Sequence, residues 1–139
     1  MKLFALDTDI LSLYQRGHLI VCRHVMAHPI SDIRITVISV EEQLSGWYAL
    51  LRATSQRDQL EVAYQSLADN IPFLAKFSIL SFSQAAMLRF DLLTSLKLNV
   101  RKMDLRIAAI ALEYGATVVT RNVRDFGRVP GLGVEDWTV

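Results

Sequence analysis

Short apolar runs alternate with longer amphipathic stretches along the whole chain. The runs are rich in β-branched residues, as buried strands are, and they lie at 2–6, 34–38, 78–81 and 116–120, with 133–135 fitting an edge strand. The stretches between them carry apolar residues at helical spacing, which predicts helices at 10–15, 18–27, 39–53, 56–68, 83–96 and 103–114. Strands that alternate with helices predict an α/β fold of three layers, α/β/α, with a mainly parallel sheet of four or five strands.

Polar residues at the borders of these segments predict where several helices begin and end. The Thr8–Asp9 pair offers a cap for the first helix. Ser39, with Glu42 three residues later, has the spacing of a capping box. Residues 69–70 predict a break, after which Pro72 suits the first turn of a new short helix.

Composition limits the classes of protein to which the chain can belong. Its 139 residues fit one domain spanning 1–139, and 52% of them are hydrophobic, which predicts a large core or an apolar surface that meets a partner. No apolar run is long enough to span a membrane, and an acid at position 7 comes too early for a signal peptide. Together with a single cysteine, Cys22, these features favour a cytoplasmic protein.

Charge is balanced over the chain but not along it. The formal net charge is +1, so the total gives no sign of nucleic-acid binding. Basic residues nevertheless crowd the last third, where a local basic region can contact phosphates or simply face solvent: Arg101, Lys102, Arg106, Arg121, Arg124 and Arg128.

Two further patterns have ordinary explanations. His24 and His28 have a zinc-compatible spacing, but no third ligand is suitably spaced, so we expect histidines at the surface or facing a partner. Apolar stripes are expected in the core, although some of their residues fit a partner-facing surface. These stripes include Trp47, Tyr48 and Leu51, and later Phe82, Met87, Leu88 and Phe90.

Acidic and amide side chains recur just after the predicted strands. Asp7 follows the first strand, Glu42 lies shortly after the second, Asn122 and Asp125 follow the fourth, and Asp104 opens the helix that leads into the fourth. Each alone has a structural explanation as a cap or a helix-dipole acid. In a parallel sheet, however, the carboxyl ends of the strands form the usual site, so we expect these residues to gather at one edge.

Bringing several carboxylates together costs electrostatic free energy, and the cation that would offset this cost indicates the chemistry of the site. Two carboxylates about 5 Å apart repel by roughly 3 kcal/mol at an effective dielectric constant near 20, so a cluster raises pKa values or requires a cation. Oxygen ligands suit Mg²⁺ or Mn²⁺. Such an ion suits hydrolysis of a phosphodiester, and the sequence therefore predicts a divalent-metal cage.

Four motifs resemble those of the PIN-domain family, in particular the VapC-like toxin ribonucleases of type II toxin–antitoxin systems. The segment LDTDIL at 6–11 is similar to the family's opening LDTNIL, with Asp9 in place of Asn. The segment SVEEQLSG at 39–46 resembles the second motif, in which the spacing to glycine selects Glu42 over Glu41. DLRIAA at 104–109 and TRNVRDF at 120–126 resemble the third and fourth motifs, and the resemblance spans nearly the whole chain.

The resemblance implies an Mg²⁺- or Mn²⁺-dependent endoribonuclease with an antitoxin partner and a homodimeric assembly. It implies catalytic and metal-binding roles for Asp7, Glu42, Asp104 and Asp125, with Glu42 completing the cage or taking a proton from the attacking water. Supporting residues are expected to be Thr8, Thr120 and Asn122, and the RNA backbone is expected to be guided by Arg101, Lys102, Arg121 and Arg124.

Alternatives with other functions remain open at this point. A PIN fold can be catalytically inactive and bind only RNA or protein. Asp7-Thr8-Asp9 also resembles the opening of haloacid-dehalogenase-like phosphatases, in which Asp7 would be the nucleophile, but that fold needs a longer chain and a later lysine. A response-regulator receiver domain fits less well, because residues 50–60 do not follow a predicted strand.

Overall fold

A computed structural model describes residues 2–139, which form a five-stranded parallel sheet. The strands are β1 (Leu3–Leu6), β2 (Ile33–Thr36), β3 (Ser78–Leu80), β4 (Ala116–Val119) and β5 (Val134–Glu135). Their order across the sheet is β3-β2-β1-β4-β5, and every neighbouring pair is parallel. The central β1 pairs with both β2 and β4, and Leu6 is in register with Val119.

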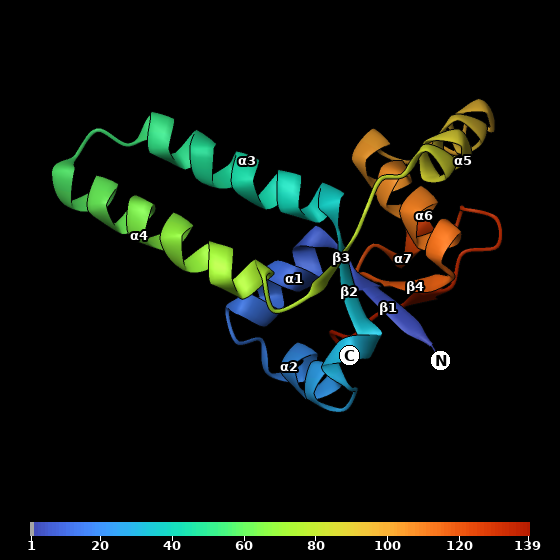
Figure 1. Ribbon diagram of the computed structural model, residues 1–139, viewed down its shortest axis with the longest axis horizontal. Helices are drawn as coiled ribbons and strands as arrows, with labels where there is room; N and C mark the ends of the chain where they lie inside the picture. The colour runs from blue at the N-terminus through green and yellow to red at the C-terminus, as the bar shows by residue number, and fades with distance from the viewer. Residues whose placement is uncertain (1) are drawn as a thin grey trace.

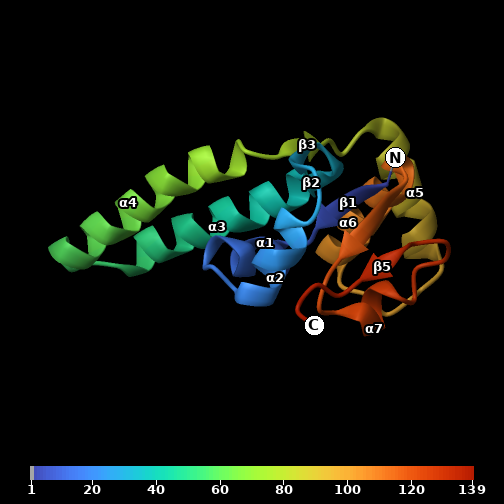
Figure 2. The same cartoon turned by 90° about the horizontal axis from the view of Figure 1, so that it is seen from below.

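Helices cover both faces of the sheet, which confirms the predicted three-layer α/β/α fold (Figures 1 and 2). One face packs on α1 (Thr8–Gln15), α2 (Leu19–Met26) and the end of α4 (Arg57–Leu74), around Leu6, Ile10, Val21 and Leu74. The other face packs on α5 (Gln84–Ser95), α6 (Lys102–Tyr114) and the short α7 (Val123–Phe126), around Ala5, Leu93, Ile107 and Phe126.

The helix that follows β2 begins earlier than predicted. α3 runs over Val37–Ala53 and is capped by Thr36, whose Oγ1 accepts from the backbone N–H of Ser39 at 3.3 Å. The capping box predicted for Ser39 and Glu42 is therefore wrong. At the first helix the predicted cap is also wrong, because the capping side chain is that of Asp7.

The predicted break at residues 69–70 is wrong as well, because α4 continues through it to Leu74. Asn70 is fully buried, and its Nδ2 donates to Oε1 of Gln43 at 2.9 Å. The helix therefore uses Asn70 to contact α3 rather than to turn. Pro72 lies in the last turn, where only one intrahelical hydrogen bond is lost.

Helices α3 and α4 form an antiparallel pair that extends well beyond the sheet (Figures 1 and 2). Several apolar side chains on this pair are exposed, among them Tyr48 on the predicted stripe, and so are Met87 and Leu88 on α5. The expectation that these residues lie in the core is wrong, and the partner-facing alternative stays a prediction. No helix within residues 2–139 is long and apolar enough to cross a membrane.

Two of the three histidines support the core instead of projecting from it. The rings of His24 and His28 stack on the buried indole of Trp137, with ring centroids 5.4 and 4.9 Å from its centroid. His18 caps α2 by accepting from the backbone N–H of Val21. His24 and His28 are both half-buried, so the pair lies at the surface as expected while it packs on the core, and the partner-facing alternative stays a prediction.

Candidate acidic site at the carboxyl edge of the sheet

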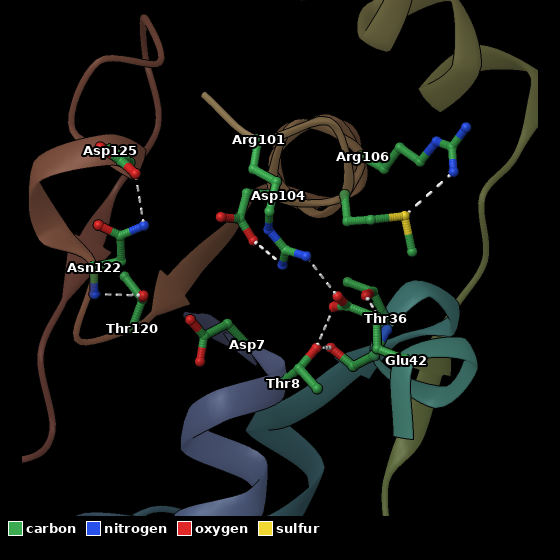
Figure 3. A network of polar contacts seen from close by, with 12 residues as sticks. Asp7, Thr8, Thr36, Glu42, Arg101, Asp104, Arg106, Thr120, Asn122 and Asp125 are labelled. Atoms are coloured by element: carbon green, nitrogen blue, oxygen red, sulfur yellow. Dashed lines mark hydrogen bonds and ion pairs between the residues drawn. The ribbon is translucent and has the colours of Figure 1, made fainter. Parts of the chain in front are cut away.

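The predicted acids and amide come from the starts of four separate helices that meet at the carboxyl ends of β1, β2 and β4 (Figure 3). Because β1 and β4 are adjacent and in register, Asp7 and Thr120 leave the sheet side by side, and the backbone N–H of Asp7 donates to the carbonyl of Val119 at 3.0 Å. The remaining predicted residues reach this edge from the starts of helices: Glu42 from the second turn of α3, Asp104 from the first turn of α6, and Asn122 with Asp125 from the start of α7.

Asp7 is the most deeply placed of the acids. Its side chain is held by the start of α1, because Oδ1 accepts from the backbone N–H of Ile10 at 2.9 Å. Burial raises the pKa of Asp7 from 3.8 to about 6, with smaller increases from the charges of Asp9 and Asp104, while hydrogen bonds from Thr120 and Ile10 oppose the shift. The site therefore contains a carboxylate that is short of positive charge.

Glu42 is oriented by a threonine from the first motif. The hydroxyl of Thr8 donates to Oε1 of Glu42 at 2.7 Å and lies 3.0 Å from Oγ of Ser39. Thr8 thus connects α1 to α3 and fixes one carboxylate oxygen. Glu41, the alternative that the glycine spacing rejects, is exposed.

Arg101 connects two of the acids with its guanidinium. Nη1 donates to Oε2 of Glu42 at 3.0 Å, and Nη2 donates to Oδ1 of Asp104 at 2.9 Å. The hydrogen bond to Asp104, followed by smaller contributions that include Glu42, raises the pKa of Arg101 above its ordinary value. The side chain of Arg101 is 57% exposed, whereas those of Glu42 and Asp104 are 17% and 12% exposed, so the arginine reaches in from the rim.

Asp125 is held by its own turn. Nδ2 of Asn122 donates to Oδ2 of Asp125 at 2.9 Å, and Arg128 donates to Oδ1 at 2.8 Å. The backbone N–H of Asn122 in turn donates to Oγ1 of Thr120 at 2.9 Å. Thr120 and Asn122 therefore hold this turn together, and Arg128 adds a contact that the prediction did not include; a supporting role for Thr120 and Asn122 in the site stays a prediction.

The predicted RNA-guiding cations have different surroundings. Arg121 forms a bidentate pair with the carboxylate of Asp9 at 2.7 and 2.8 Å, which neutralises the extra acid of the first motif. Lys102 and Arg124 are exposed near the acidic edge. Sequence reasoning missed the Arg101 bridge and the Arg121 pair, although the acid at position 9 was a signal that a nearby cation could balance it.

The acids share one edge but do not form a closed cage. Within residues 2–139, no three Asp, Glu, His or Cys side chains are arranged so that they could hold a metal ion together. Instead, Arg101 supplies positive charge to Glu42 and Asp104, and Arg128 supplies it to Asp125. The donor chemistry of these carboxylates fits a hard divalent cation.

Comparison with known proteins gives one related sequence and several similar structures. No protein-family model matches the chain. The Ribonuclease VapC2 of Rickettsia felis is 36% identical over 69 residues, which are 47% of this chain and 52% of the relative. The chain thus spans about half the length of the curated relative that it matches.

The similar structures cover nearly the entire chain. A structure of DNA-bound VapBC from Salmonella typhimurium matches with a TM-score of 0.77 and 25% identity, and covers 99% of both chains. A structure of VapBC2 from Rickettsia felis bound to a promoter DNA fragment matches with a TM-score of 0.71 and 24% identity over 97% of this chain and 98% of the other. These matches confirm the resemblance to VapC-like PIN-domain proteins and the PIN-like fold.

Proposed function

From this resemblance in sequence and fold, we propose that the chain is a divalent-metal-dependent endoribonuclease, the toxin of a type II toxin–antitoxin pair, acting in the cytoplasm. One observation carries the proposal: acids from four motifs meet at the carboxyl edge of the sheet around Asp7, whose burial raises its pKa to about 6. Burying a carboxylate among other acids is costly without a function that uses their charge.

Mg²⁺ or Mn²⁺ would be held by Asp7, Asp104 and Asp125, with Glu42 at the rim of the same set. When bound, such an ion supplies a Lewis acid for the phosphodiester and makes a water molecule more acidic. Asp7 favours a cation because its charged form is otherwise disfavoured by burial. Thr120 and Asn122 keep Asp7 and Asp125 in place.

The remaining steps use side chains of this protein. Glu42 is oriented by Thr8 through Oε1, so Oε2, once released by Arg101, is set to accept a proton from the attacking water. Arg101 turns from Glu42 and Asp104 toward the phosphate, where its guanidinium matches the phosphate oxygens. Lys102, Arg121 and Arg124 add positive potential along the path of the RNA backbone.

The exposed apolar surface of the protein indicates that it binds other protein chains. Tyr48, Leu50, Val62 and Tyr64 on the α3–α4 pair and Leu88 and Leu92 on α5 are all exposed, and apolar surface of this extent favours association. We assign these surfaces to an antitoxin and to a second copy of the chain. Size-exclusion chromatography with light scattering tests the homodimer.

The test is cleavage of labelled total RNA with Mg²⁺, with Mn²⁺ and with EDTA. The variant Asp104→Asn keeps the shape of a buried acid and removes its charge, so we expect cleavage to fall by at least about 100-fold, the scale of lost transition-state stabilisation at a reacting centre. The control Asp91→Asn changes an exposed acid on α5 and should cleave like the parent.

Full cleavage by Asp104→Asn in the presence of magnesium would refute the assignment of the site. If the folded parent protein, free of inhibitor, binds RNA without cleaving it under any of the three conditions, the inactive binding module replaces the nuclease. A phosphorylated Asp7 after incubation with a phosphoryl donor would instead indicate a phosphatase.

A further inference from the structure

A hollow beside the acidic site is lined, apart from Thr8 and Glu42, by side chains that the proposed reaction does not use. It has a volume of about 290 Å³, and we name it the Gly46 hollow; its walls are Thr8, Ser12, Gln15, Glu42, Gln43, Gly46, Trp47 and Leu50. We propose that the Gly46 hollow binds one base of the RNA substrate, next to the phosphate that is cleaved. This inference rests on the proposed ribonuclease function and deepens it by locating where the substrate is read.

The Gly46 hollow adjoins the acidic site. Thr8 and Glu42 line it and also belong to the acidic site, where the Thr8 hydroxyl donates to Glu42 at 2.7 Å. A group in the hollow is therefore within one side chain of the reacting centre. The volume is close to the lower end of ligand pockets, roughly 300 Å³, which suits one small ring system rather than a large ligand.

Nothing in the packing of α3 requires a glycine at position 46. It lies within α3, where glycine lowers helix stability relative to alanine. A Cβ placed on Gly46 would meet no atom within 4 Å, so neither a close backbone approach nor a crowded neighbour explains the residue. What the missing side chain does is keep the hollow open.

The polar wall of the hollow contains the side-chain amide of Gln43, which is fixed in position. Gln43 is 9% exposed; its Nε2 donates to Oγ of Ser12 at 3.2 Å, and its Oε1 accepts from Asn70 at 2.9 Å. Since Ser12 accepts from Gln43, its own hydroxyl hydrogen can point into the hollow. A fixed carboxamide and a hydroxyl are suited to the hydrogen-bonding edge of a base.

Trp47 gives the Gly46 hollow an aromatic ring on which a base can stack. Proteins that recognise single-stranded RNA stack its bases on aromatic rings and read their edges with polar side chains. A second hollow of about 280 Å³ shares Ser12, Gln15 and Trp47 with the first and adds Arg16, Ser66 and Asp69. The two hollows therefore share the ring of Trp47, and the second leaves room for a neighbouring nucleotide.

The test fills the hollow from the helix that forms its wall. Gly46→Leu places an isobutyl group in the hollow, and the matched control Gly46→Ala raises helix propensity but adds only a methyl group. The probe is a random-sequence decaribonucleotide with a central 2-aminopurine and a terminal fluorophore, studied in EDTA so that it is not cleaved. Anisotropy gives the dissociation constant, 2-aminopurine quenching reports stacking, and electron paramagnetic resonance gives Mn²⁺ affinity without RNA.

We expect Gly46→Leu to weaken RNA binding about tenfold, within the range for one stacked base, and to lose most of the quenching while it keeps parental Mn²⁺ affinity. Gly46→Ala should retain most of the RNA affinity. Parental RNA affinity and quenching in Gly46→Leu would overturn the proposal and leave the groove to a protein partner. A parallel loss of Mn²⁺ affinity would also overturn it, because the substitution would then act on the acidic site. Absence of metal-dependent cleavage by the parent would instead overturn the ribonuclease function.

Discussion

Replacing Asp7 by asparagine should stabilise the protein at neutral pH in the absence of metal. The amide has the shape of the carboxyl group and retains an oxygen that can accept from the backbone N–H of Ile10, so the cap of α1 survives. What disappears is a negative charge on a residue that is only 7% exposed. The substitution thus separates the charge of Asp7 from its structural role.

The size and pH dependence of the effect follow from the raised pKa. Because the pKa of Asp7 is about 6 in the folded protein against 3.8 ordinarily, the folded state holds this proton more tightly than the unfolded state. The parent therefore loses stability as the pH rises from about 4 to about 6 and beyond, by roughly 3 kcal/mol in total. Asp7→Asn lacks this loss, so the variant should equal the parent near pH 4 and exceed it by about 3 kcal/mol at pH 7.5.

Urea unfolding in EDTA at pH 4.5, 6 and 7.5 measures this difference, with Asp91→Asn as the exposed-acid control. Addition of Mg²⁺ should then stabilise the parent much more than Asp7→Asn, because a ligand stabilises the state that binds it. A difference between Asp7→Asn and the parent that stays constant with pH, or an Asp7→Asn variant less stable than the parent at pH 7.5, would refute the reasoning from burial.

Two further predictions concern Arg101 at the acidic edge and Trp137 in the core. Arg101→Ala should raise Mn²⁺ affinity roughly tenfold, because it removes a positive charge from a site for a cation, and should weaken RNA binding; Lys102→Ala, an exposed neighbour, should leave Mn²⁺ affinity nearly unchanged. Equal Mn²⁺ affinities for Arg101→Ala and Lys102→Ala, measured by electron paramagnetic resonance, would contradict the bridging role. Trp137→Ala should cost about 3–5 kcal/mol in urea unfolding, because the indole is 1% exposed and stacks on His24 and His28; a loss below about 1 kcal/mol would show that the stack is not structural.

The sequence predicts those features whose causes are local. Apolar runs mark the strands, and the acids at their carboxyl ends mark the edge where the site forms, because a parallel sheet brings these ends together. Gly115 follows the same local logic, because it ends α6 with φ of 67°, a conformation that glycine adopts readily.

Features that depend on distant partners could not be predicted in the same way. The burial of Asn70 in α4 depends on Gln43, and the bridge made by Arg101 depends on Glu42, 59 residues away. A turn former that finds a buried partner stays helical, and a cation at a helix start can serve an acid on another element. The same reasoning applies to His24 and His28, whose stacking surface is supplied by Trp137.

The outer turns of the projecting α3–α4 pair are expected to open by local unfolding. Beyond Gln43 on α3 and before Asn70 on α4, only Ala63 is a buried residue of the pair, so the outer turns bury much less side-chain surface than the turns near the sheet. Segments of this kind open without unfolding of the whole domain. Amide hydrogen exchange should therefore be fast from about residue 48 to residue 62 and slow around Glu42, with the boundary between mobile and rigid helix at Gly46 and Trp47.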